Sequence, residues 1–154
     1  MSTPFFAGVG GVVSADIAVP EHEREQAFYA RVLTTGDRPL WQEDLLSDRG
    51  LPIIGLGARS PEYERLPLQW MPHLQVANVG ASVARGLELG GEELLHGRDD
   101  AGASRWAVLL DPQGAAFGLI PVIPADALSP AGRSAGEAGQ GTGCIARLDL
   151  AVAD

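Results

Sequence analysis

The feature that most constrains this chain is an internal repeat of a strand, a helix and several short strands. The strands predicted over 12–19 and 68–76 both end in hydrophobic–Xaa–Val, 57 residues apart. Turn sequences close to Gly50 and Gly114 occupy equivalent places in the two copies. A repeating unit of this size cannot bury its apolar face alone, so the two halves are expected to pack together.

The first half is expected over residues 12–58. Small and β-branched residues over 12–19 predict a strand, and the apolar spacing that follows predicts a helix over 21–33. Two or three short strands complete this half, and residues 59–67 are a polar connection. The apolar stripe of the helix consists of Phe28, Tyr29, Val32 and Leu33.

The second half is expected over residues 68–123 and repeats the order of the first. It begins with the strand over 68–76, and Asn78 is placed to cap a helix that Gly90 and Gly91 end. The apolar face of that helix consists of Val79, Val83 and Leu87. Three further strands are predicted over 92–96, 105–110 and 116–122. The chain is therefore predicted to be α+β, with strands in the majority.

The two ends of the chain differ in composition from the repeat. Residues 1–11 are expected to be an N-terminal leader, and the Pro/Ala/Gly/Ser-rich residues 124–142 a linker. Within 143–154, Asp149, Ala151 and Val152 match Asp16, Ala18 and Val19 at a constant offset of 133. We interpret this tail as a strand that resembles the start of a second module; the alternative is an ordinary C-terminal strand that matches by chance.

Composition excludes several classes of partner. Eleven Lys and Arg residues against twenty Asp and Glu residues give a net charge of −9, which disfavours nucleic acid and anionic membrane surfaces. Cys144 is the only cysteine and cannot form an internal disulfide, and no long apolar segment is present. A cytoplasmic location is therefore expected.

The stretch from Met71 to Pro121 resembles vicinal-oxygen-chelate modules, the superfamily of glyoxalases, bleomycin-resistance proteins and related dioxygenases. Its sequence Trp-Ala-Val-Leu-Leu-Asp-Pro-Gln-Gly-Ala-Ala-Phe-Gly-Leu-Ile is similar to the hairpin that closes such modules. In the first half, ADIAVPEHEREQAFYARVL is similar to the family's first strand and helix. The resemblance covers about residues 12–123 and implies two βαβββ repeats in a cupped, open mixed β-barrel with the helices outside. The linker and tail resemble the first module of a tandem-module bacterial protein.

The resemblance also implies four positions for metal ligands, on the first and last strands of each half. They fall on Ser14, on Met71, on Ile54 or Gly55, and on Gly118. None of these side chains is a good ligand for a first-row metal. The family's fold is therefore expected without its metal, and no cofactor is predicted.

Asp16 and His73 are the candidate catalytic residues. Each lies three residues before the terminal Val of its strand, so the repeat makes the two positions equivalent. Strand alternation places Asp16 on the face of Ser14, and His73 on the face of Met71. The resemblance implies that this face lines the cavity, where a carboxylate and an imidazole can do acid–base work. The alternatives are polar residues with a structural role, or a metal on Asp16, His73 and His96.

The other candidate ligand-binding residues are aromatic or small. Trp41 and Trp106 lie on middle strands, where indole faces can line a cavity for flat or apolar ligands. Gly118 leaves room where a side chain would otherwise project. Together with the strand residues above, the predicted ligand-binding set is Ser14, Asp16, Trp41, Met71, His73, His96, Trp106 and Gly118.

Three functions stay open at this point. The favoured hypothesis is a metal-independent protein that binds an apolar or aromatic small molecule. The second is a lyase, isomerase or hydroxylase-like enzyme that uses Asp16 and His73, or an atypical divalent metal. The third is a module that only supports a missing second module. The resemblance implies that the partner is a second copy, forming a homodimer, or that missing module.

Overall fold

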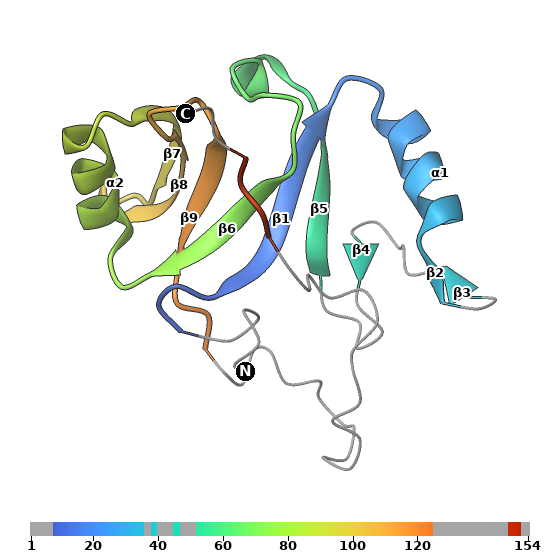
Figure 1. Ribbon diagram of the computed structural model, residues 1–154, viewed down its shortest axis with the longest axis horizontal. Helices are drawn as coiled ribbons and strands as arrows, with labels where there is room; N and C mark the ends of the chain where they lie inside the picture. Colours follow the sequence, from blue (N-terminus) through green and yellow to red (C-terminus); the bar gives the residue numbers. More distant parts are fainter. Residues whose placement is uncertain (1–7, 36–37, 40–44, 47–51, 125–147, 152–154) are drawn as a thin grey trace, which may run out of the picture.

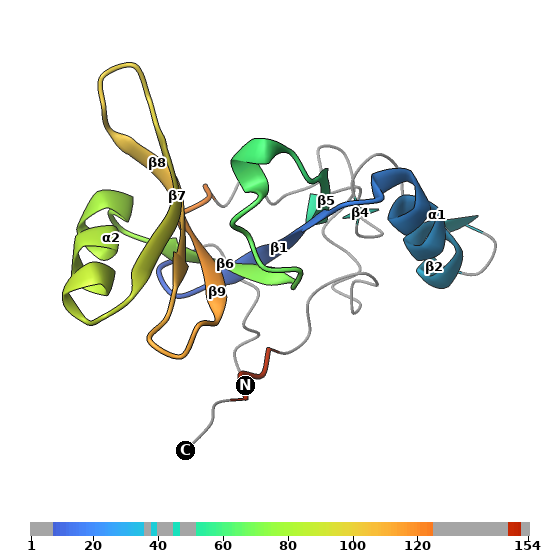
Figure 2. The ribbon, with the colours of Figure 1, turned by 90° about the horizontal axis from the view of Figure 1, so that it is seen from above.

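The computed structural model of the chain describes residues 8–35, 38–39, 45–46, 52–124 and 148–151. Its elements, in chain order, are β1 (Val12–Val19), α1 (His22–Val32), β2 (Thr34–Thr35), β3 (Arg38–Pro39), β4 (Leu45–Leu46), β5 (Pro52–Ala58), the 3₁₀ helix η1 (Pro61–Tyr63), β6 (Met71–Val76), α2 (Val79–Glu88), β7 (Glu92–Arg98), β8 (Ser104–Leu110) and β9 (Ala116–Pro121). A mixed seven-stranded sheet runs in the order β4-β5-β1-β6-β9-β8-β7. The sheet curls, and α1 and α2 lie at its opposite ends (Figures 1 and 2). The predicted α+β class is confirmed.

The two halves meet where β1 runs antiparallel to β6. In this register Ser14 lies opposite His73, and Asp16 lies opposite Met71. The repeat made Ser14 equivalent to Met71 and Asp16 equivalent to His73. The two cross-strand pairs are therefore related by the pseudo-twofold symmetry that was expected from the sequence.

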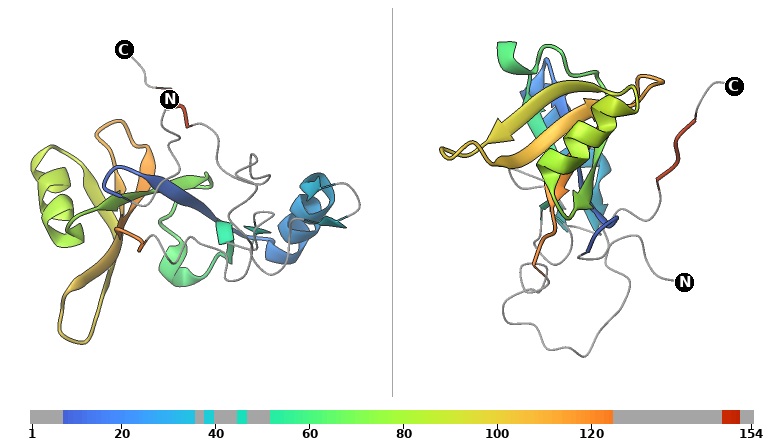
Figure 3. Two further views of the ribbon diagram at one scale, coloured as in Figure 1. Left: turned by 90° about the horizontal axis from the view of Figure 1, so that it is seen from below. Right: turned by 90° about the vertical axis from the view of Figure 1, so that its left-hand side faces the viewer.

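The second half follows the predicted pattern closely. The Asn78 side chain accepts a hydrogen bond from the backbone N–H of Ala81 at 2.9 Å, which caps α2. Gly90 follows the helix with a φ of 89°, a left-handed conformation that suits glycine. Val79 and Val83 are buried. They belong to a cluster with Ala107, Leu109 and Leu119, through which α2 packs on β8 and β9. The right-hand view of Figure 3 shows α2 lying across these strands.

The first half departs from the repeat. β2 and β3 form a separate two-stranded sheet, and β4 has only two residues. No residue of α1 is buried. Tyr29 and Leu33 pack partly against the core, whereas Phe28 and Val32 are 55% and 57% exposed. The predicted stripe is therefore right for Tyr29 and Leu33, which pack against the cluster on β1 and β5, and wrong for Phe28 and Val32.

Strand boundaries in the second half also differ from the prediction. β6 begins at Met71 rather than at residue 68, and Leu68 is exposed. β7 and β8 extend further toward their connecting turn than the sequence indicated. In that turn the Asp99 carboxylate accepts the backbone N–H of Ala103 at 2.8 Å and pairs with Arg105 at 2.9 Å. The Ala103 hydrogen bond, and then the Arg105 charge, lower the pKa of Asp99.

The predicted leader and the predicted C-terminal strand differ in their structure. Gly10 donates its backbone N–H to the Gln75 carbonyl at 2.8 Å, so the end of the predicted leader is attached to β6. Residues 148–151, part of the tail predicted to be a strand, form no strand. The predicted turn near Gly50 and residues 125–142 of the linker lie outside the described residues. Among the described residues, no helix is long and apolar enough to cross a membrane.

Candidate functional site

A cavity of about 470 Å³ lies at the junction of the two halves. Its walls come from β1, β5, β6, β7, β8 and β9, together with the connection that contains η1. Seen from above, η1 and the β7–β8 hairpin extend to the same side of the sheet (Figure 2). The apolar residues of the wall are Ile17, Ala18, Leu56, Leu66, Met71, Leu95, Ala107, Val108 and Ile120.

Asp16 and His73 form the polar part of the wall. The Oδ2 atom of Asp16 lies 3.3 Å from Nε2 of His73. The Oδ1 atom of Asp16 accepts the backbone N–H of Gly55 at 2.9 Å. The Asp16 side chain is 46% exposed and the His73 side chain 17%. Asp16 is half-exposed, so water screens its contact with His73 and the contact adds little to stability.

Ser14 contacts the other nitrogen of the His73 ring. Its Oγ lies 2.8 Å from Nδ1 of His73. The Asp16 carboxylate can only accept hydrogen bonds, so its position 3.3 Å from Nε2 of His73 favours a proton on that nitrogen. The neutral tautomer with the proton on Nε2 then leaves Nδ1 to accept the Ser14 hydroxyl. Ser14 and Asp16 together orient the imidazole and select this tautomer.

Two glycines make room for this pair. Asp16 is paired in register with Gly55 on β5, and His73 with Gly118 on β9. A Cβ atom at Gly55 would lie 2.3 Å from Oδ1 of Asp16. A Cβ atom at Gly118 would lie 2.2 Å from Cδ2 of His73. In both halves, therefore, the first-strand side chain lies in the space above a glycine of the last strand.

Aromatic residues complete the wall. The Trp106 indole lies over Gly97, where a Cβ atom would be 2.2 Å from Nε1 of the indole. Tyr63 reaches the cavity from η1, within the segment that the sequence indicated only as a polar connection. Burial, and secondly the neighbouring Glu62 carboxylate, raise the pKa of the Tyr63 phenol above its ordinary value. The Tyr63 and Leu66 pair in an otherwise polar segment was the available signal.

The predicted site residues other than His96 fall into three groups. Asp16, Met71, His73 and Trp106 line the cavity together. Ser14 and Gly118 were predicted to contact ligand, but neither lines the cavity. Both lie against the His73 ring instead, Ser14 at Nδ1 and Gly118 below Cδ2. Trp41 lies outside the described residues.

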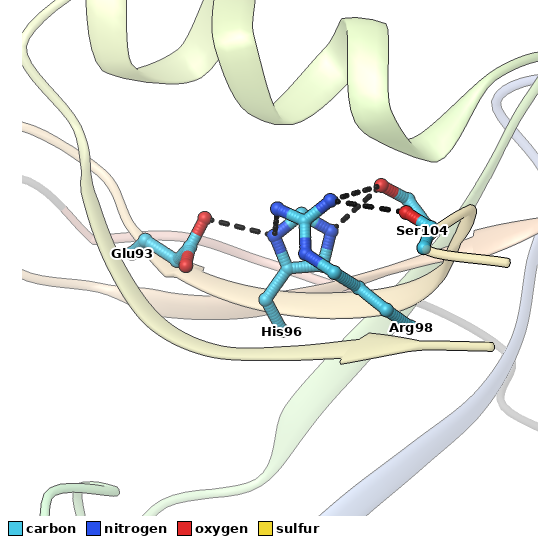
Figure 4. Close-up of polar contacts among 5 residues, drawn as sticks. Glu93, His96, Arg98 and Ser104 are labelled. Carbon is cyan, nitrogen blue, oxygen red and sulfur yellow. Dashed lines mark hydrogen bonds and ion pairs between the residues drawn. The ribbon is translucent and has the colours of Figure 1, made fainter. Parts of the chain in front are cut away.

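His96 does not belong to the cavity, contrary to the prediction. Its side chain is 6% exposed and lies beneath α2 (Figure 4). Nδ1 lies 3.0 Å from both Oε2 of Glu93 and a guanidinium nitrogen of Arg98, and Nε2 lies 2.8 Å from Oγ of Ser104. The alternation along β7 explains the error, since Leu95 faces the cavity and its neighbour faces the opposite layer.

Comparison with known families identifies the fold. The glyoxalase-like domain pattern matches residues 12–120, most of the chain. The chain belongs to the glyoxalase-like domain family. This match is consistent with the vicinal-oxygen-chelate superfamily that the closing hairpin of the second half resembles. Among curated proteins, none matches the chain significantly.

The metal site that the superfamily implies does not fit the residues of this glyoxalase-like domain. Two of its four positions fall on Ile54 or Gly55 and on Gly118, and Asp16 and His73 fill the space above the two glycines. Among the described residues, no group of three or more His, Cys, Asp or Glu side chains is placed to hold a metal ion. The alternative set of Asp16, His73 and His96 is not assembled, because His96 lies beneath α2.

Proposed function

We propose that this glyoxalase-like domain binds a small molecule with an apolar or aromatic body, without the metal of the superfamily. The observation that carries the proposal is the cavity of about 470 Å³, with apolar walls and one convergent polar pair. Protein sites for small ligands typically have volumes of roughly 300–1,000 Å³ and a few polar groups among apolar ones. The aromatic rings of Trp106 and Tyr63 add flat surfaces that suit a ring-containing ligand.

The first test is to fill the cavity from Gly57. A Cβ atom at Gly57 would meet only the Ile17 carbonyl oxygen, at 3.9 Å, so a larger side chain fits there without a backbone clash. The probe is 2-naphthylmethanol, an uncharged bicyclic alcohol, titrated by calorimetry. We expect saturable binding with a Kd below about 1 mM, as ligands of this size allow. The Gly57→Phe variant should weaken it at least about tenfold, by occupying the volume.

The matched control is Ala84→Phe. Ala84 is exposed on α2, outside the cavity, so the substitution adds the same ring without occupying the volume. Its affinity for the probe should equal that of the unmodified chain. Absence of saturable binding, or equal loss in both variants, would contradict the proposed site.

A second candidate function is acid–base catalysis, which the contact between Asp16 and His73 favours. Asp16 and His73 face one cavity, and Ser14 orients the imidazole through its contact with Nδ1. A positioned carboxylate or imidazole can remove a proton from a carbon next to a carbonyl group and return one. This function retains the same cavity and assigns the polar pair to a reaction rather than to recognition alone.

Hydrogen exchange tests that candidate. Small aryl ketones are incubated with the protein in D₂O, and deuterium next to the carbonyl is followed by NMR. Catalysis predicts incorporation above the buffer rate, lost in both Asp16→Asn and His73→Gln. Folding of both variants is checked by circular dichroism. Incorporation that persists in both variants would rule out these roles, and absence of exchange would leave binding as the function.

A further inference from the structure

We propose that the cavity selects cationic ligands: an ammonium group on an apolar or aromatic body, with the ammonium bound at Asp16. This inference rests on the proposed function, since it assigns a chemical class to the ligand of the same cavity. It follows from the chemistry of the polar pair, from the residues that line the walls and from the charge of the chain.

The hydrogen-bond donors around Asp16 are already used. The Gly55 N–H points to Oδ1 of Asp16, and Nε2 of His73 lies against Oδ2. A carboxylate has about four lone-pair positions, and these two contacts occupy at most two of them. What remains available to a ligand at this point is acceptor capacity. A ligand group that donates hydrogen bonds is matched there, and one that only accepts is not.

The charges of the residues that line the cavity also favour a cationic ligand. Asp16 is the only lining residue, among those that the structure describes, that carries a full charge when His73 is in its neutral tautomer. No described lysine or arginine lines the cavity. A carboxylate or phosphate ligand would therefore enter an apolar space beside a like charge, which is unfavourable. An ammonium group gains a charge-assisted hydrogen bond instead.

The aromatic wall fits a cation as well. Trp106 and Tyr63 line the cavity, and the faces of aromatic rings attract cations. The chain as a whole carries a net charge of −9, which raises the concentration of small cations near its surface. The exposure of Asp16, at 46%, leaves its carboxylate accessible to an incoming ligand.

Three probes with one ring system isolate the contribution of charge. They are 2-naphthylmethylammonium, 2-naphthylmethanol and 2-naphthoate, which present a cation, a neutral hydroxyl and an anion. Binding is measured by calorimetry at pH 8, above the pH at which a histidine side chain in water takes up a proton. We expect the ammonium to bind about tenfold more tightly than the alcohol, and 2-naphthoate more weakly than either.

Two charge-matched variants locate the effect. Asp16→Asn keeps the size of the side chain and an oxygen for the Gly55 N–H, but removes the charge. Glu88→Gln removes the same unit of charge from an exposed position on α2, where Glu88 pairs with Arg85. The preference for ammonium over alcohol should fall to about one in Asp16→Asn and persist in Glu88→Gln.

Each outcome decides between the two proposals. Alcohol binding as tight as ammonium binding, or tightest binding of 2-naphthoate, overturns the cation selectivity but leaves the proposed binding function intact. A preference lost equally in both variants assigns it to the net charge and also overturns the inference. If none of the three probes binds, the proposed function fails and the inference fails with it.

Discussion

At the scale of residues, the site depends on side chains that lie over glycines. Asp16 is placed over Gly55, and His73 over Gly118, because no Cβ atom fills the space in either place. The resemblance implies metal-ligand positions on the last strands at Ile54 or Gly55 and at Gly118, and here Asp16 and His73 lie above the two glycines. The absence of a side chain at Gly55 and at Gly118 therefore helps Asp16 and His73 to lie within 3.3 Å of each other.

Adding one methyl group at Gly118 should disturb this arrangement. In Gly118→Ala the new Cβ would meet the His73 ring at 2.2 Å, so the imidazole must shift from its present position. We expect a loss of about 1–3 kcal/mol in the free energy of unfolding, measured by urea denaturation. In a His73→Ala background the same substitution should cost less than about 0.5 kcal/mol, because the obstacle is gone.

The difference between these two costs measures the coupling of Gly118 to His73. Equal costs in both backgrounds would show that the glycine is needed for the backbone of β9 instead. The backbone at Gly118 is not left-handed, so relief of backbone strain does not enter the comparison.

At the scale of elements, the two helices show which features the local sequence predicts and which it does not. Asn78 caps α2 through its side chain, and the helix then packs on the sheet through Val79 and Val83. At α1 the capping position is Glu21, whose side chain makes no capping hydrogen bond. The start of α2 was predictable because the cap is a local interaction. The packing of α1 was not, because it depends on contacts with β1 and β5, which are distant from part of the helix in sequence.

The two capping positions give a matched comparison. Asn78→Ala removes the acceptor for the Ala81 N–H, and we expect it to reduce the free energy of unfolding by about 1 kcal/mol. Asn78→Asp keeps an acceptor and should cost less. Glu21→Ala should change stability by no more than about 0.5 kcal/mol, since only its exposed ion pair with Arg24 is lost. Equal effects of the two alanine substitutions, measured by urea denaturation, would refute the role of the Asn78 cap.

At the scale of the whole molecule, Gln75 connects parts that are distant in sequence. It is fully buried, and its Oε1 accepts the backbone N–H of Gly8 at 3.3 Å and of Ile123 at 2.9 Å. Its Nε2 donates to the Gly11 carbonyl at 3.2 Å. One side chain thereby attaches both the segment before β1 and the segment after β9 to the middle of the sheet.

Some expectations at this scale stay predictions. They concern a second copy or a second module as partner, a cytoplasmic location, and the resemblance of the tail to the start of another module. Residues 148–151 of that tail form no strand here, while the others in 143–147 and 152–154 lie outside the described residues. Sedimentation of the purified chain distinguishes a monomer from a homodimer.

The sequence by itself determined the order of elements and the equivalence of Asp16 and His73. Both follow from patterns that can be read along the chain, namely alternation along a strand, a helix cap and a repeat with a constant offset. It also indicated that the implied ligand positions, at Ser14, Met71, Ile54 or Gly55, and Gly118, lack good metal ligands. These properties need no knowledge of which segments meet in space.

Only the tertiary structure decided which side chains share the cavity. His96 has a residue type that suits a site, yet it lies beneath α2, whereas Tyr63 enters the wall from a connection with no regular pattern. The role of Ser14 as the support of His73 also depends on the register between β1 and β6. Contacts between segments distant in sequence are set by the packing of the whole sheet, and no local pattern encodes them.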